Sequence, residues 1–203
     1  MTRPRTTYDA VILAGGAGRR LGGRDKAALT VAGRPLLWRV LQAAQRARQV
    51  VVVGQVDTPD GVRRVLEDPA GGGPVAGINA GVGALSQPAP WTCVLAVDQP
   101  GAGPALASIT AALDTVGPDV DALCHRDGTG HAQWLLAAYR HPALLTALTE
   151  HGTGHGVAMG RLVAPMRFEY LSAGAEHIGD IDTWTDHADW EQRLSHEQGD
   201  TGR

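Results

Sequence analysis

Aromatic side chains are scarce in this chain of 203 residues, because Phe, Tyr and Trp together make up only 4% of it. The net charge at pH 7 is −3. Nucleic-acid binding usually relies on a basic surface, often with aromatic side chains that stack on bases. No stretch of the sequence approaches the roughly 20 apolar residues of a membrane span. We therefore expect neither a nucleic acid nor a membrane as a partner.

Cysteine is also rare, with two residues, Cys93 and Cys124, in apolar runs that are typical of buried strands. Two buried free thiols suit a reducing compartment better than a disulfide-bonded secreted protein. Residues 1–7 are polar and basic and lack the apolar stretch of a secretory signal. We expect a cytoplasmic protein.

Lysine occurs once, at Lys26, so that 17 of the 18 Lys and Arg residues are arginines. A lone lysine in such a background indicates a position that needs a compact point charge rather than the planar fork of arginine. Ten of the 18 basic residues fall in residues 1–50, against two acids, Asp9 and Asp25. This asymmetry predicts a local anion-binding site in the first part of the chain.

Strand-length apolar runs alternate with segments of helical periodicity. Residues 9–14, 50–53 and 92–97 are almost continuously apolar, which predicts parallel strands buried on both faces. Further strands are predicted at 120–124, 134–139 and 166–171, and helices at 35–48, 61–65, 75–85, 104–116, 141–151 and 182–194.

This alternation predicts one α/β domain over residues 8–193, with a three-layer, largely parallel Rossmann-like sheet. The tails, residues 1–7 and 194–203, are polar, and we expect both to be frayed.

Residues 9–26 combine a predicted strand, five glycines and a basic cluster in the sequence DAVILAGGAGRRLGGRDK. Ligands of parallel sheets bind beyond the carboxyl ends of the strands, and glycines let backbone N–H groups turn toward an anion. The loop is not the dinucleotide-binding G-x-G-x-x-G, because Leu21 occupies its last glycine position. Nor is it a P-loop, because Lys26 is followed by Ala27. The chemistry suits a triphosphate, but neither a nicotinamide enzyme nor a P-loop NTPase is favoured.

The same loop, LAGGAGRRLGGRDK at 13–26, resembles the signature of the MobA-type molybdenum cofactor guanylyltransferases. Four other segments fit that family in order: EDPAGGGPVAG, VLAVDQP, GHAQWLLAAY and DIDTWTD. The resemblance spans residues 8–190 and implies the fold of the nucleotide-diphospho-sugar transferases, of GT-A-like type. It also implies transfer of GMP from GTP to the phosphate of molybdopterin or the molybdenum cofactor, with release of pyrophosphate.

For the nucleotide, the resemblance implies that Arg20 and Lys26 hold the phosphates and assist catalysis. Asp68 matches the acid that recognises guanine in the family. The remaining nucleotide-binding positions implied are Leu13, Ala14, Gly15 and Gly16 in the first loop, and Gly73, Pro74 and Gly77 in a second glycine-rich turn.

For the metal, Asp98 matches the acid of the family's D-x-P motif and would bind Mg²⁺. Asp180 and Asp182 alternate in an extended segment, so both would point to one face and complete the metal site. The family has Asn at these two positions, and the alternative for Asp182 is a helix N-cap. His131 aligns with a histidine on the acceptor side. Trp134 is expected to pack in the core.

Other functions stay open at this stage. A cytidylyltransferase of the same cofactor tends to carry L-A-A-G and P-A-A-G, where this chain has LAGG and PVAG. Residues 152–161 carry less positive charge than the family, which leaves open another acceptor, such as a deazaflavin precursor or a sugar phosphate. A catalytically silent GTP-binding subunit is the non-enzymatic alternative. Proteins that deliver the cofactor are expected as further partners.

Overall fold

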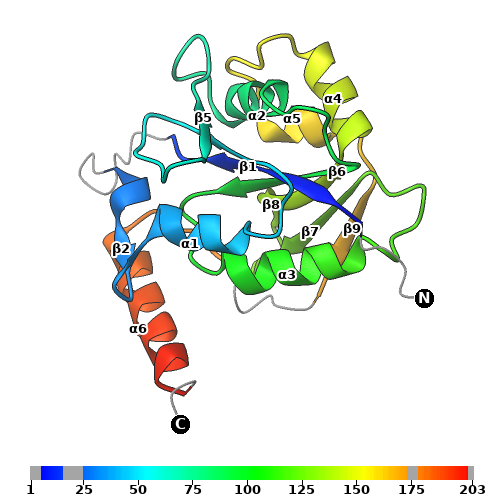
Figure 1. The fold of residues 1–203 in the computed structure, drawn as a ribbon. Helices are drawn as coiled ribbons and strands as arrows, with labels where there is room; N and C mark the ends of the chain where they lie inside the picture. The colour runs from blue at the N-terminus through cyan, green and yellow to red at the C-terminus, as the bar shows by residue number, and fades with distance from the viewer. Residues whose placement is uncertain (1–5, 16–24, 173–177, 201–203) are drawn as a thin grey trace.

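The computed structural model describes residues 6–15, 25–172 and 178–200. Its centre is a seven-stranded sheet with the strand order β5-β4-β1-β6-β8-β7-β9 (Figure 1). The strands are β1 (Tyr8–Leu13), β4 (Val50–Val53), β5 (Arg63–Val65), β6 (Trp91–Ala96), β7 (Ala122–Arg126), β8 (Ala132–Arg140) and β9 (Phe168–Leu171). A small separate hairpin consists of β2 (Thr30–Val31) and β3 (Arg34–Pro35).

The sheet is mostly parallel, as predicted. Strand β1 pairs in parallel with β4 and β6, β4 with β5, and β7 with β9. Strand β8 runs antiparallel to both of its neighbours, β6 and β7. Only a short turn joins β7 to β8, and a connection of that length can only reverse the chain.

Helices cover both faces of the sheet, which gives the three predicted layers. They are α1 (Leu36–Ala43), α2 (Pro74–Gly83), α3 (Ala102–Ala112), α4 (His141–Glu150), α5 (Met159–Val163) and α6 (Trp184–Asp200). Helices α1 and α3 lie on one face, and α2, α4 and α5 lie on the other (Figure 1). Alternate residues of β1 serve the two cores: Ala10 and Ile12 belong to one, Val11 and Leu13 to the other.

Two predictions about the elements are wrong. Residues 61–65 were predicted to be helical, but Arg63–Val65 form the edge strand β5 on β4. The open edge of β4 instead offers this segment backbone hydrogen bonds, with Val51 opposite Arg63 and Val53 opposite Val65. The tail was predicted to begin at residue 194, but α6 continues to Asp200. Leu194 is buried against the core and holds this part of the helix in place.

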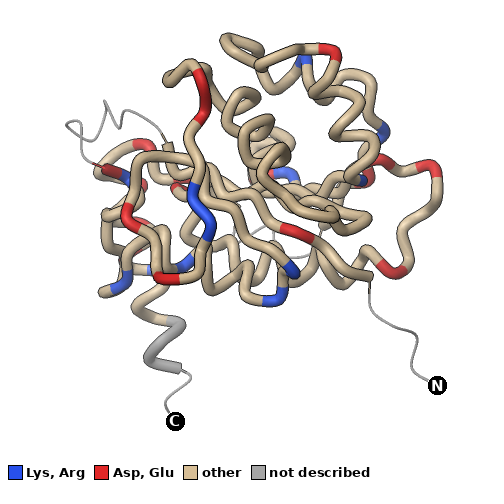
Figure 2. The backbone as a smooth tube through the Cα atoms, turned by 45° about the horizontal axis from the view of Figure 1, so that its top comes forward, with Lys and Arg blue, Asp and Glu red and all other residues tan. Residues whose placement is uncertain are grey.

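The structure also shows where the two cysteines and the charged residues lie. Cys93 and Cys124 are free and buried, and burial raises the pKa of Cys124 to about 11. In the view of Figure 2, basic and acidic positions are interspersed along the described chain. Within the described ranges, no helix is both long and apolar enough to cross a membrane.

Gly81 lets α2 lie directly on the sheet. A β-carbon added there would lie 2.3 Å from Cγ1 of Val11 and 3.0 Å from Cγ2 of Val53. Both valines are buried, and their branched side chains have little rotameric freedom. A β-carbon at Gly83, the last residue of the same helix, would meet no atom within 4 Å.

These contacts predict opposite outcomes for two alanine substitutions in one helix. Gly81→Ala should lower the free energy of unfolding by about 1–3 kcal/mol, because overpacking outweighs the better helix propensity of alanine. Gly83→Ala should be neutral or stabilising by up to about 1 kcal/mol. Urea denaturation of both variants measures the difference. Equal stability of the two would contradict the close packing of α2 on β1.

Candidate active site

A cleft of about 980 Å³ opens at the edge of the sheet where the parallel strands end. The last residue of β1, Leu13, lies level with Val53 at the end of β4 and with Ala96 at the end of β6. Loops that leave these strands therefore meet at one place, as expected for ligand sites of parallel sheets. Leu13, Val53 and Ala96 all line the cleft.

Strand β8 forms the far wall of the cleft because it is longer than its neighbour. Its pairing with β6 ends at Leu136 opposite Leu95. Leu135 is therefore level with Ala96, the last residue of β6, and residues 132–134 extend past it; all four residues from 132 to 135 line the cleft. A hairpin that overshoots its neighbouring strand thus supplies a second surface opposite the first loop.

The first loop leaves β1 through a close backbone contact. Gly54 has φ +145°, and a β-carbon there would lie 2.8 Å from the carbonyl carbon of Ala14 and from the nitrogen of Gly15. Only glycine fits this position. Gly15 lines the cleft, whereas Ala14 is buried beside it. The predicted ligands Gly16 and Arg20 lie outside the described residues.

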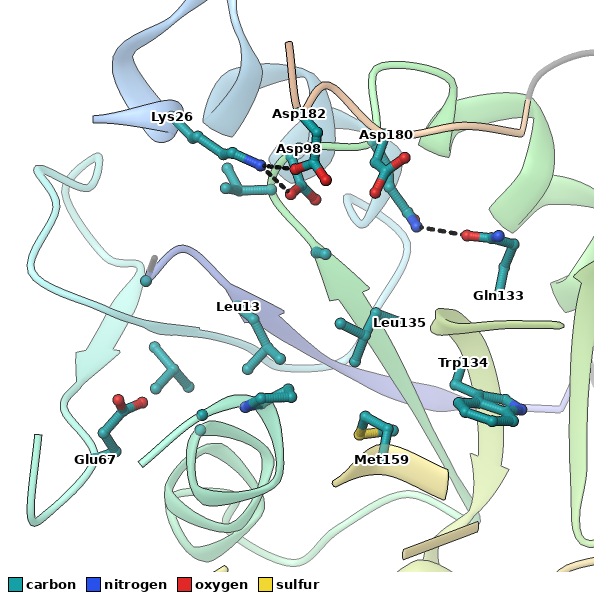
Figure 3. A pocket seen from close by; sticks show the side chains of 18 of the residues that line it. Leu13, Lys26, Glu67, Asp98, Gln133, Trp134, Leu135, Met159, Asp180 and Asp182 are labelled. Atoms are coloured by element: carbon teal, nitrogen blue, oxygen red, sulfur yellow. Dashed lines mark hydrogen bonds and ion pairs between the residues drawn. The ribbon is translucent and has the colours of Figure 1, made fainter. Parts of the chain in front are cut away.

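Three carboxylates meet at the centre of the cleft, as the sequence predicted. One oxygen from each of Asp98, Asp180 and Asp182 lies within 4.8 Å of the other two (Figure 3). Asp98 follows β6, and its carbonyl accepts a hydrogen bond of 2.9 Å from the backbone N–H of Ile181. The Ile181 side chain is fully buried. Because neighbouring side chains of an extended segment alternate, the residues on either side of Ile181 point into the cleft.

Neither Asp98 nor Asp182 caps a helix. Helix α3 starts after Gly101, without a side-chain cap. Helix α6 starts after Thr183, whose Oγ1 accepts a hydrogen bond from the backbone N–H of Asp186. Oδ2 of Asp186 in return accepts one from the backbone N–H of Thr183, which is the reciprocal pattern of a capping box. The alternative role considered for Asp182 is therefore taken by Thr183.

Lys26 binds two of the three carboxylates. Its Nζ donates to Oδ2 of Asp98 at 2.9 Å and to Oδ1 of Asp182 at 2.7 Å (Figure 3). Burial by itself lowers the pKa of Lys26, but the hydrogen bonds and charges of Asp182 and Asp98 outweigh it, so that the pKa is raised. Lys26 is therefore cationic at neutral pH. It sits in the short helix η2 (Lys26–Ala28), which the Asp25 side chain caps by accepting from the Ala27 N–H.

The cluster has the composition of a site for a hard divalent cation. Desolvation within the cleft raises the pKa of Asp180, although its side chain is exposed, and the charges of Asp98 and Asp182 raise it further. Negative charge is thus concentrated beyond what Lys26 neutralises. Carboxylate oxygens are the protein ligands that Mg²⁺ prefers. These three residues fit such an ion.

The second glycine-rich turn forms one side of the half of the cleft near Glu67. Gly73 precedes α2 with φ +87°, and Pro74 is the first residue of that helix. A β-carbon at Gly77 would lie 3.1 Å from Cδ2 of Leu13 and 3.3 Å from Oε2 of Glu67. Gly73, Pro74 and Gly77 all line the cleft, together with Glu67.

The predicted base-recognition acid, Asp68, is not at the cleft. Its side chain is exposed, and Glu67 lines the cleft in its place (Figure 3). Oε1 of Glu67 accepts a hydrogen bond of 2.9 Å from the N–H of Gly71. The reason is the parity of the extended chain after β5: Val65 and Glu67 are half-buried, whereas Leu66 and Asp68 are exposed. The mistaken helix over 61–65 concealed this alternation.

His131 is also not at the cleft. It lies at the turn between β7 and β8 with a side chain that is 83% exposed. Its Nδ1 is 2.6 Å from the hydroxyl of Thr129. The residues that follow it enter the cleft instead, because β8 begins at Ala132. The acceptor role predicted for His131 has no support in this geometry.

The half of the cleft near Trp134 consists of residues that the sequence did not single out as site residues. Trp134 was expected to pack in the core, but it is half-buried and lines the cleft beside Met159 of α5. Gln99 and Gln133 line the same half and are joined by a hydrogen bond of 3.3 Å (Figure 3). Gln133 and Trp134 reach the cleft because β8 extends past the end of β6, and no local sequence pattern indicates this extension.

Solved structures of nucleotidyltransferases have the same fold. The molybdopterin-guanine dinucleotide biosynthesis protein A of Archaeoglobus fulgidus superposes with a TM-score of 0.70 at 20% identity, covering 93% of this chain and 99% of that one. The 2-C-methyl-D-erythritol 4-phosphate cytidylyltransferase of Thermus thermophilus gives 0.66 at 19% identity, covering 94% and 100%. At these identities the similarity concerns the fold alone.

Similarity in sequence is more specific. Molybdenum cofactor guanylyltransferase of Acidiphilium cryptum is 44% identical over 79 residues, which cover 36% of this chain and 40% of that protein. The enzyme of the same name from Cereibacter sphaeroides is 38% identical over 76 residues, covering 36% and 39%. The chain thus matches about two fifths of the length of these relatives. The family model of the MobA-like NTP transferase domain matches residues 10–165, and the chain therefore belongs to that family.

Proposed function

We propose that this protein transfers GMP from GTP to the phosphate of molybdopterin or of the molybdenum cofactor, releasing pyrophosphate. The observation that carries the proposal is the position of the carboxylate cluster and Lys26. They lie between two unlike halves of one cleft, one near Glu67 and one near Trp134. The relatives named above are guanylyltransferases of this cofactor, which supports the choice of substrates.

We assign the half of the cleft near Glu67 to the nucleotide and the half near Trp134 to the acceptor, and the nucleotide half suits a guanine base. Its walls are Leu13, Val53 and the glycines around α2, which leave room for a flat ring. The carboxylate of Glu67 is held by the Gly71 N–H through Oε1, and Oε2 lies over Gly77. A carboxylate accepts hydrogen bonds only, and guanine presents two adjacent donors, N1–H and the 2-amino group. Cytosine presents a donor beside the N3 acceptor, which a carboxylate would repel. This favours GTP over the cytidylyl alternative.

The reaction needs positioning and charge stabilisation more than covalent help from the protein. An oxygen of the acceptor phosphate attacks the α-phosphorus of GTP, a new P–O–P bond forms, and the bond from the α-phosphorus to the oxygen bridging to the β-phosphorus breaks. Pyrophosphate leaves with the electron pair. The ammonium of Lys26 lies where it can stabilise the negative charge that develops on the transferring phosphoryl group. Mg²⁺ held by Asp98, Asp180 and Asp182 would add positive charge beside the same oxygens.

The crowding of three carboxylates in the cleft argues against the alternative of a catalytically silent GTP-binding subunit. A protein that only bound GTP would have no need for crowded carboxylates at the phosphate end of the cleft, which repel the nucleotide unless a cation is bound. We also propose that Arg20, in the first loop, binds the phosphates of GTP together with Lys26. A cytoplasmic location and delivery of the cofactor by a partner protein stay predictions.

The direct test is pyrophosphate release from GTP, CTP, ATP and UTP in turn, with Mg²⁺ and with or without molybdopterin. Turnover with GTP that requires the acceptor, and that falls by about a hundredfold or more in Asp98→Ala, is the expected result. Turnover with CTP instead would assign the cytidylyl reaction. Measurable GTP binding without turnover on active molybdopterin would reject this acceptor.

The position of Glu67 predicts which carboxylate selects the base. Glu67→Gln should raise the KM for GTP about tenfold or more, because its amide N–H₂ would face a donor of guanine. Asp68→Asn, the matched change at the adjacent exposed acid, should leave KM within about twofold. Steady-state kinetics of the two variants at saturating acceptor make the comparison. A larger effect at Asp68 would return base recognition to that residue.

A further inference from the structure

The acceptor half of the cleft presents the indole ring of Trp134. The carbonyl of Trp134 accepts a hydrogen bond of 2.6 Å from the hydroxyl of Tyr139, which is fully buried. On the α5 side, an added β-carbon at Gly160 would lie 3.7–3.8 Å from the ring carbons Cη2 and Cζ3. The hydrogen bond thus anchors the backbone of Trp134, and the indole lies near α5 and borders the cleft next to Met159 (Figure 3). A flat partner is what such a surface binds best.

A chain of three polar side chains borders the same space. Oδ2 of Asp127 accepts a hydrogen bond of 2.9 Å from Nε2 of Gln133. Oε1 of Gln133 in turn accepts one of 3.3 Å from Nε2 of Gln99. The Gln133 oxygen is directed toward the cleft (Figure 3). Since a carbonyl oxygen has two lone pairs, it can accept a second hydrogen bond from a ligand.

Residues outside the cleft determine which group donates and which accepts in these hydrogen bonds. Oδ1 of Asp127 accepts hydrogen bonds from the N–H and the hydroxyl of Thr129 and from the N–H of His131. The Thr129 hydroxyl, with these backbone N–H groups, lowers the pKa of Asp127, so that this carboxylate is ionised at neutral pH. An ionised carboxylate can only accept. Gln133 must therefore turn its amino group to Asp127 and its oxygen to Gln99 and the cleft.

We propose that the acceptor half binds a planar heterocycle with N–H donors on its edge, stacked on Trp134 and hydrogen-bonded to Oε1 of Gln133. Asp127 is a positioning residue that sets which end of the Gln133 amide faces this ligand. The inference rests on the proposed function in taking the ring to belong to the phosphate-bearing acceptor. A pterin has the required flat ring, ring N–H and amino group. A sugar phosphate has no aromatic face to stack on the indole of Trp134 and no ring N–H for Oε1 of Gln133.

Turning the side-chain amide of Gln133 around, by a substitution at Asp127, tests the proposal. In Asp127→Asn, the new amide oxygen can still accept from Thr129 and His131, so its N–H₂ faces Gln133. Gln133 must then turn its oxygen to residue 127 and present N–H₂ to the cleft, where it opposes a ligand N–H. Adding Gln133→Glu to Asp127→Asn restores an acceptor, because a carboxylate can accept from Asn at 127 and from Gln99 while facing the ligand. The double variant has the net charge of the wild type.

The measurement is isothermal titration with neopterin monophosphate, in parallel with its analogue methylated at N3 and on the 2-amino group. The wild type should bind the analogue at least about tenfold more weakly. Asp127→Asn should raise the Kd of neopterin monophosphate about tenfold, and the double variant should return it to within about threefold of wild type. Trp134→Leu should raise the Kd about 5- to 150-fold, whereas Trp134→Phe should keep most of the affinity. The Kd of a non-hydrolysable GTP analogue should not change in any variant.

Equal affinity of the single and double variants, equal binding of the two probes, or no binding of neopterin monophosphate by the wild type would overturn the proposal. Turnover with GTP and molybdopterin separates this inference from the proposed function. Normal turnover with an unchanged acceptor KM in the variants rejects only the inference. The expected binding pattern without turnover supports the ring subsite and rejects the proposed reaction.

Discussion

The ammonium of Lys26 allows three carboxylates to share the end of one strand. Two like charges about 4 Å apart near a protein surface repel each other by roughly 4 kcal/mol, and the cluster of Asp98, Asp180 and Asp182 contains three such pairs. Lys26 offsets part of this repulsion through two hydrogen bonds of 2.9 and 2.7 Å. A surplus of negative charge is left, and this surplus is what attracts a divalent cation. The only lysine in the sequence thus lies beside the cluster of three carboxylates.

The backbone around this cluster holds the pieces in register. The hydrogen bond from Ile181 to the carbonyl of Asp98 ties a segment near the end of the chain to the end of β6. On the other side, Gly54 lets β4 approach the start of the first loop. Between these two contacts the cleft divides into a half near Glu67 and a half near Trp134. The division suits an enzyme that joins two different substrates through their phosphates.

Much of this could be predicted from the sequence, because it depends on local patterns. Continuous apolar strands fix the parallel sheet, and the order of strand, glycine loop and acid places Lys26 and Asp98 at one edge. The alternation around Ile181 correctly predicted that Asp180 and Asp182 face the same way. The predictions that failed concern residues whose position depends on how strands pair and on which side of an extended segment they lie. A helix assigned to 61–65 concealed the parity that turns Glu67 inward and Asp68 outward, and the overshoot of β8 past β6 moves Trp134 from the core to the cleft.

The central claim is that the carboxylate cluster holds the catalytic cation next to the triphosphate. The position of Mn²⁺ in crystals grown with a non-hydrolysable GTP analogue tests it most directly, because the anomalous signal of Mn²⁺ locates the ion without assumptions about activity. The account predicts a peak about 2.2 Å from a carboxylate oxygen of Asp98, with Asp180 or Asp182 as a further ligand and a phosphate oxygen completing the contact. Bound nucleotide with Mn²⁺ elsewhere, or with no ion at these three residues, would contradict it.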